Sequence, residues 1–193
     1  MADLISHGQR VHLVGQGASD LASALGITSS ELESADVAIF LVSAKDGIVR
    51  ADSDKWLVAR ELYIPSIVVI TDLSAENETD FEDMAAIAGR ILDPVVTPYL
   101  VLHLDDGSPV ALIELLTQEI REYVAGSLTK RASEHEHQEV IAEFREEYLE
   151  ELEAAGEGAF ENGLLYPAVP WISGNPMGLI EIAEYLNRIP ITR

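Results

Sequence analysis

The chain has 193 residues and a formal net charge of −22, with 12 Lys and Arg against 34 Asp and Glu. This length suffices for one substantial core, and no apolar run approaches the roughly 20 residues that span a bilayer. The lysines, Lys45, Lys55 and Lys130, form no cluster that could neutralise a phosphate backbone, and the absence of cysteine excludes disulfides and thiolate chemistry. These bounds predict a compact cytoplasmic protein that contacts neither nucleic acid nor membrane. The acidity is explained by a solvated surface, and an acidic face for a basic partner is the alternative explanation.

Residues 10–26 predict a short strand, a Gly-Gln-Gly turn and a helix that ends at Gly26. Glycines before a helix can form an anion site, because free amides and the helix dipole converge there. A phosphate loop also needs a lysine followed by a hydroxyl, and Ser19 and Asp20 stand at those places. Gly15 and Gly17 are therefore candidates for backbone contacts to a ligand, and a tight turn is the alternative explanation.

The segment 35–74 is the centre of the predicted fold. Two β-branched apolar runs, each followed by polar residues, flank a helix expected from Ala51 to about Tyr63. This pattern predicts a parallel crossover buried on both faces, with Trp56 in the core. Thr28 or Ser29 is predicted to cap a short helical turn that precedes the segment 35–74.

After the second run, Thr71-Asp72-Leu73-Ser74 leads into a helix from about Asp80, which Pro94 ends. Residues 95–104 predict the next strand. The helix is expected to bury one face, made by Phe81, Met84, Ile87, Ala88 and Ile91.

Residues 105–163 are predicted to be mainly helical. A turn at 105–109 precedes a stripe at helical spacing that Gly126 closes, made by Val110, Ile113, Leu116, Ile120 and Tyr123 or Val124. The longest helix is expected over 132–155, with Val140 and Phe144 on its buried side and glutamates outside. Its two histidines, His135 and His137, point apart on a helix, so no metal site is expected.

Residues 164–172 predict the last strand, which runs into Ser173-Gly174-Asn175. A final helix follows, with Leu179, Ile182, Ala183 and Leu186 at helical spacing.

The order of these features resembles the GTPase domain of elongation factor G and related translational GTPases. There, a strand and Asp-Ala lead to a Gly-Val turn, a Trp-bearing helix and a strand ending in Asn-Lys-Met-Asp. The resemblance covers about residues 10–193 and implies a single α/β domain over 1–193, P-loop GTPase-like. It also implies a mainly parallel sheet with helices on both faces, and it makes residues 105–163 a helical insertion before the last strand. The strand at 11–14 is then expected beside 37–43, in the place of the family's first strand.

The resemblance also locates the functional motifs, and each departs from the family's pattern. The guanine-reading motif falls on Thr71–Ser74, so that Asp72 replaces the lysine over the base and Ser74 the aspartate that binds guanine. Ser173 and Gly174 fall on the base-contacting loop. In an ungapped second register, Gly15 replaces a magnesium-associated aspartate and Ser19 the catalytic histidine.

The sequence therefore predicts a degenerate translation-factor GTPase-like domain that acts as an interaction module, with no catalytic residues, metal or cofactor and with a translation-related protein partner. The alternative is a GTP-binding elongation factor G-like protein, or a fragment of one, that retains GTP or GDP with magnesium through backbone amides. The vestigial contact candidates are Gly15, Gly17, Ser19, Thr71, Asp72, Ser74, Ser173 and Gly174.

Overall fold

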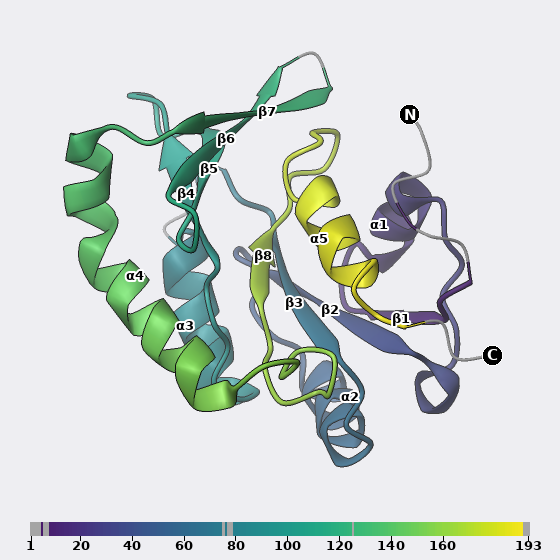
Figure 1. Ribbon diagram of the computed structural model, residues 1–193. Helices are drawn as coiled ribbons and strands as arrows, with labels where there is room; N and C mark the ends of the chain where they lie inside the picture. Colours follow the sequence, from purple (N-terminus) through teal and green to yellow (C-terminus); the bar gives the residue numbers. More distant parts are fainter. Residues whose placement is uncertain (1–4, 6–7, 75, 77–78, 125, 191–193) are drawn as a thin grey trace.

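The structure is a computed structural model that describes residues 5, 8–74, 76, 79–124 and 126–190. It contains a parallel sheet and a separate antiparallel sheet, with helices around them (Figure 1). The fold is therefore mixed α/β. The predicted parallel sheet is confirmed for four strands, and four further strands form an antiparallel sheet that was not predicted.

The parallel sheet has the order β1-β2-β3-β8, comprising β1 (Val11–Val14), β2 (Val37–Ser43), β3 (Ser66–Thr71) and β8 (Ala168–Pro170). Every residue of these strands is buried. Continuous β-branched runs are what a parallel sheet covered on both faces requires. The predicted pairing of β1 with β2 is confirmed, in the register Val11 with Val37.

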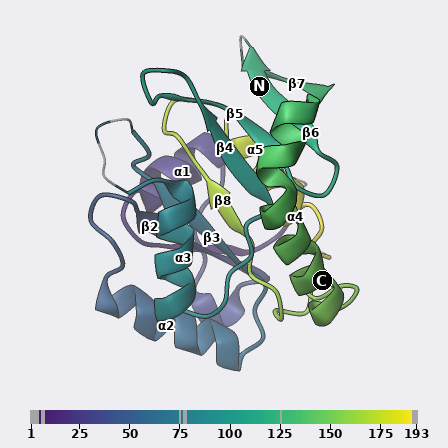
Figure 2. The same ribbon diagram turned by 90° about the vertical axis from the view of Figure 1, so that its left-hand side faces the viewer.

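Four helices flank the parallel sheet. Helices α1 (Ala18–Leu25) and α5 (Leu179–Leu186) lie together on one side, and α2 (Arg50–Glu61) and α3 (Phe81–Ile91) on the other (Figures 1 and 2). Gly26 ends α1 in the left-handed conformation, as the sequence predicts, and α3 begins directly after Asp80, whose side chain caps it. Trp56 is buried in the core between Phe40 and Tyr166.

The predicted helix over 110–124 is wrong. These residues form β5 (Pro109–Glu114) and β6 (Glu119–Val124), which pair with β4 (Tyr99–His103) and β7 (Ser127–Ala132) in the antiparallel order β4-β5-β6-β7. The reversal between β5 and β6 uses Gln118 at φ 58, a left-handed conformation that no Gly or Pro signals in the sequence. The residues of the predicted helical stripe also do not share one buried face, because Val110, Leu116 and Val124 are exposed.

Only the second half of the expected insertion is helical. Helix α4 (His135–Ala155) packs on the antiparallel sheet through a second cluster of buried residues that includes Ile120, Ile141 and Tyr148. Val140 and Phe144, predicted to be buried, are 72% and 44% exposed. On α3, Ile87 and Ile91 are likewise exposed rather than buried.

The outer edge of β1 is closed by the segment that joins α1 to β2. The Leu13 amide donates to Ser29 Oγ at 2.9 Å, and the Ser30 amide donates to the Val11 carbonyl at 2.8 Å. The sequence predicted Ser29 as a helix cap, but the short turn η1 (Leu32–Ser34) has no side-chain cap. Ser29 instead satisfies an edge-strand amide. Within the described residues, no helix is long and apolar enough to span a membrane.

Candidate functional site at the carboxyl edge of the parallel sheet

A pocket of about 270 Å³ opens where the parallel strands end. Carboxyl ends of parallel strands meet at one edge of a sheet, which is where α/β folds bind ligands. Three segments build the walls, one following each of β1, β3 and β8. The lining residues are Gln16, Gly17, Asp20, Thr71, Asp72, Leu73, Trp171, Ile172 and Ser173.

Four of the eight candidates from the sequence, Gly17, Thr71, Asp72 and Ser173, line this pocket. The other four do not.

Gly15 lies against β2, where a Cβ would approach the Leu41 carbonyl oxygen to 2.3 Å. Ser19 is exposed on α1 and Gly174 is exposed with open space around it. Ser74 lines a different cavity, of about 210 Å³, beside Asp80 and His103.

Backbone amides in the turn between β1 and α1, and at the start of α1, already donate to carbonyl groups of the turn itself. The Ala18 amide donates to the Gly15 carbonyl at 3.3 Å, and the amides of Asp20 and Leu21 both donate to the Gly17 carbonyl at 3.0 Å. A phosphate cradle needs such amides to point at the ligand. Three amides of this turn are therefore already committed within the protein.

The electrostatics of the pocket are unfavourable for an anion. Asp20 and Asp72 are exposed and contribute carboxylates, and none of the described residues that line the pocket is Lys or Arg. The Asp20 carboxylate in the first turn of α1 also supplies the negative charge that favours a helix N-terminus. The residues present therefore do not fit a magnesium nucleotide.

Two features of the pocket wall are strained or incompletely bonded. Asp72 has φ 56, and its Oδ2 lies 3.3 Å from the Thr71 hydroxyl. Trp171 is only 3% exposed, and its Nε1 has no acceptor among the residues that the structure describes. Such exceptions to local satisfaction concentrate at functional sites.

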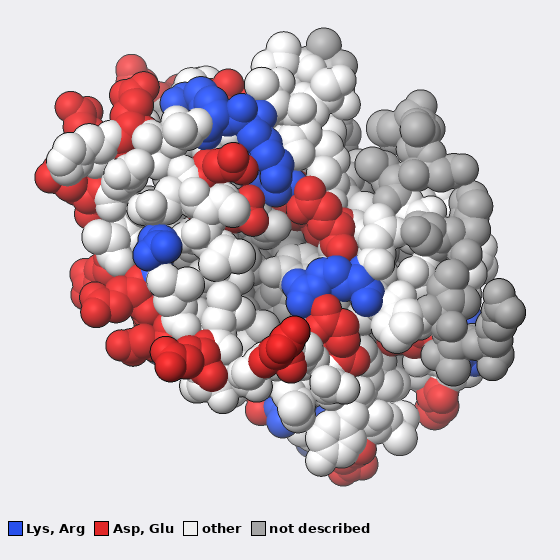
Figure 3. Space-filling view, in the orientation of Figure 1, with Lys and Arg blue, Asp and Glu red and all other residues white. Residues whose placement is uncertain are grey.

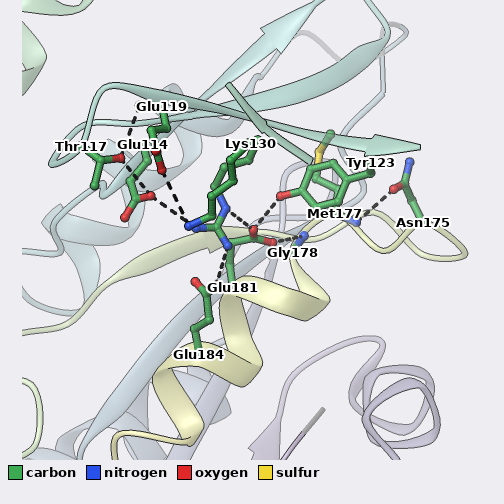
Figure 4. A network of polar contacts seen from close by, with 11 residues as sticks. Glu114, Thr117, Glu119, Tyr123, Lys130, Asn175, Met177, Gly178, Glu181 and Glu184 are labelled. Carbon is green, nitrogen blue, oxygen red and sulfur yellow. Dashed lines mark hydrogen bonds and ion pairs between the residues drawn. The ribbon is translucent and has the colours of Figure 1, made fainter. Parts of the chain in front are cut away.

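A buried ion cluster holds the antiparallel sheet to α5, beside the loop that lines the pocket (Figure 4). Arg121 of β6 is 1% exposed, and its Nε lies 2.7 Å from Glu181 Oε1 while Nη2 lies 2.7 Å from Glu184 Oε1. Nη1 lies 3.3 Å from Glu114 Oε2. Burial opposes the charge, but the carboxylates of Glu184 and Glu181 prevail and raise the pKa of Arg121 above its ordinary value.

Glu181 links this cluster to the pocket. Its Oε1 accepts from the Tyr123 hydroxyl at 2.6 Å, and its Oε2 accepts from the Gly178 amide at 2.9 Å. A Cβ on Gly178 would lie 2.1 Å from the Pro170 carbonyl oxygen and 2.8 Å from Trp171 Cα. The start of α5 therefore packs closely against the backbone of Pro170, at the end of β8, and of Trp171.

A second concave surface, the α3–α4 groove, has a volume of about 350 Å³. Its floor contains small residues of α3, including Ala85, Ala86 and Gly89, and Phe144 of α4 stands at its side. Glu147 and Glu151 extend the acidic surface of α4, which carries eight glutamates and one arginine (Figure 3). Sequence reasoning missed both this groove and the Arg121 cluster, because each is made by residues distant in the chain.

No model of a protein family matches the chain. It is 27% identical, over 213 aligned residues, to an elongation factor G-like protein of Mycobacterium tuberculosis in each of two strains. That match covers 97% of this chain and 29% of the relative. A solved structure of a Thermus thermophilus protein is 26% identical with a TM-score of 0.70, over 83% of this chain and 27% of that one.

The chain thus resembles a domain related to elongation factor G. It spans less than a third of the length of the relatives that it matches.

Proposed function

We propose that this chain is a translation-factor-related, GTPase-like domain that acts as an interaction module and does not hydrolyse GTP. Similarity to elongation factor G-like protein over 97% of the chain supports the translation-factor ancestry. The observation that carries the loss of hydrolysis is the chemistry of the carboxyl-edge pocket, where two aspartates and no basic residue replace a phosphate site.

The connection between α1 and β2 supports the same proposal. GTPases sense the γ-phosphate through switch segments that order around it and its magnesium ion. Here residues 26–36 are the whole connection, and part of it closes the β1 edge through Ser29 and Ser30. This connection is too short to form switch segments as well, because part of it already bonds the edge of β1.

The α3–α4 groove supports a role in interaction. Phe144 is 44% exposed at its side, small residues of α3 leave room along its floor, and Glu147 and Glu151 make its border negative. A surface with an apolar centre and an acidic border suits a basic amphipathic helix. The partner that we propose presents such a helix.

A model peptide of leucine and lysine in a helical pattern tests this surface by titration calorimetry. The variant Glu147→Gln/Glu151→Gln should weaken binding about tenfold, since each of the two lost charge pairs contributes roughly 0.7 kcal/mol. The matched variant Glu136→Gln/Glu139→Gln removes the same charge from the exposed start of α4 and should change binding less than about twofold. Equal losses in both variants would show that only net charge attracts the peptide.

The alternative is a GTP-binding protein that retains GTP or GDP with magnesium. One observation favours it, because Gly17, Thr71, Asp72 and Ser173 meet around one pocket as a nucleotide site would require. In this case Gly17→Asp should abolish nucleotide-dependent protection against thermal unfolding. A thermal shift by Mg·GTP that survives Gly17→Asp would place the nucleotide outside this pocket, and the absence of any shift in the wild-type chain would remove the alternative.

A further inference from the structure

We propose that the outer edge of β7 binds an extended segment of a partner protein as an added strand, and that this segment carries two consecutive acidic residues. This surface is separate from the α3–α4 groove. The inference therefore adds a second point of contact, and its failure would leave the proposed function standing.

β7 is the last strand of the antiparallel sheet and lies at the margin of the molecule (Figure 1). The other sheet edges are covered by the chain itself: Ser29 and Ser30 bond β1, Val96 pairs beside β8, and the Val101 amide of β4 donates to Glu82 Oε1 at 3.0 Å. Among the residues that the structure describes, none outside β6 hydrogen-bonds the backbone of β7. Such an edge offers a row of backbone donors and acceptors to another strand.

The pairing with β6 determines which backbone groups of β7 face outward. Inward and outward groups alternate along an antiparallel strand. The Ser133 amide, directly after β7, donates inward to the Gln118 carbonyl at 3.1 Å, and the register of β7 on β6 is unbroken. By this alternation, the outward backbone groups are those of Leu128, Lys130 and Ala132.

The side chains of this edge define the charge of the partner. Lys130 and Arg131 are the one place in the chain where two Lys or Arg residues are consecutive, and consecutive residues of a strand point to opposite faces. They are 41% and 43% exposed, and Figure 3 shows a cluster of basic side chains in this part of the molecule. An added strand therefore meets one cation on each face, which two consecutive carboxylates match.

Both cations can bind a further carboxylate. Lys130 Nζ lies 3.8 Å from Glu119 Oε2. Arg131 Nε lies 2.8 Å from Glu122 Oε1, and its Nη1 lies 3.8 Å from Glu134 Oε1. Only the 2.8 Å contact is within hydrogen-bond range, and an ammonium has three donors and a guanidinium five. Donors of both side chains thus remain for a partner.

A second copy of this chain is a less suitable strand. Pairing two β7 edges would bring the same cations together, and each copy carries a net charge of −22. An edge of 6 residues also offers less surface than the roughly 1,200 Å² that a stable dimer buries. A segment of a different protein has neither disadvantage.

The probe is the peptide acetyl-Thr-Val-Glu-Glu-Val-Thr-amide, titrated into the full chain at about 0.15 M salt, with amide shifts and hydrogen exchange measured by nuclear magnetic resonance. We expect saturation at about 1 mM or below, with slower exchange of the outward amides of Leu128, Lys130 and Ala132. The matched peptide with two lysines in place of the glutamates should bind at least about tenfold more weakly, although the net charge of the chain attracts it. Absence of saturation, or tighter binding of the lysine peptide, overturns the proposal.

N-methylation at alternate positions of the peptide tests the backbone pairing and leaves the protein unchanged. Alternate amides of an added strand point toward β7 and away from it. Methylation of one set should therefore weaken binding at least about tenfold, and methylation of the other set less than about twofold. Equal effects of the two sets overturn the added strand.

Matched charge variants test the two cations. Lys130→Gln/Arg131→Gln should weaken binding of the glutamate peptide at least about fivefold. Arg50→Gln/Lys55→Gln, which removes the same charge from exposed positions of α2, should change it less than about twofold. Equal losses in both variants overturn the proposal. Concentration-dependent shifts of the β7 amides without peptide would make a second copy the occupant and would overturn it as well.

Discussion

Replacing Arg121 by Met should remove the cation at the centre of the buried cluster. The methionine fills a similar volume, so the main loss is electrostatic. Glu181 is 0% exposed and would keep only the Tyr123 hydroxyl and the Gly178 amide as donors. Glu184 is 46% exposed, so water replaces part of what it loses.

The expected cost follows from this burial. Breaking a buried ion pair by removing one partner costs about 3 to 5 kcal/mol. At about 2 to 4 °C per kcal/mol for a chain of this size, the melting temperature should fall by roughly 6 to 20 °C. Urea and thermal unfolding, followed by circular dichroism at pH 7, measure both quantities.

Two variants make the test specific. Arg131→Met removes an arginine that is 43% exposed from its pair with Glu122 at 2.8 Å, and should cost less than about 1 kcal/mol. Arg121→Met/Glu181→Gln should recover part of the stability, because glutamine retains an acceptor without the unpaired charge. The reasoning is refuted if Arg121→Met costs no more than Arg131→Met, or if the double variant is less stable than the single one.

Three further changes test the packing and the electrostatics. Gly178→Ala should cost more than about 3 kcal/mol, because its Cβ would meet the backbone of β8 at 2.1 Å, whereas Gly174→Ala, also at positive φ but in open space, should cost about 1 kcal/mol in urea unfolding. Ser29→Ala should cost about 1 to 3 kcal/mol by leaving a β1 amide unpaired, against less than about 0.5 kcal/mol for the exposed Ser19→Ala. Burial raises the pKa of Glu82 above its ordinary 4.5, so its contribution to stability is lost as the pH rises through the raised value. Glu82→Gln should therefore lose less stability than the wild type between pH 4.5 and 7, and an identical pH dependence would contradict this cause.

The parallel sheet could be predicted from the sequence, because its strands are continuous apolar runs with clear polar ends. Thr71 and Ser173 are predicted to belong to a site for a different reason, since the resemblance to elongation factor G places its base-contacting motifs on them. The antiparallel sheet could not be predicted in this way. Its strands satisfy a helical spacing as well as an alternating one, and Gln118 makes the reversal without a turn residue that the sequence would reveal.

The Arg121 cluster could not be predicted because it depends on contacts between β6 and α5, which are 60 positions apart for Arg121 and Glu181. In the sequence, Arg121 stands between Glu119 and Glu122, and nothing there indicates that its partners lie on the last helix. The α3–α4 groove has the same origin, since small residues of α3 become a floor only when α4 lies beside them. Both features require the tertiary arrangement that local patterns do not contain.

The central claim is our proposal that this chain, which resembles a domain related to elongation factor G, does not bind guanine nucleotide, and titration calorimetry with Mg·GTP and Mg·GDP tests it most directly. The two aspartates, the committed amides of the β1–α1 turn and the absent lysine predict no saturable heat up to millimolar nucleotide. Magnesium-dependent binding with a micromolar dissociation constant would contradict the claim.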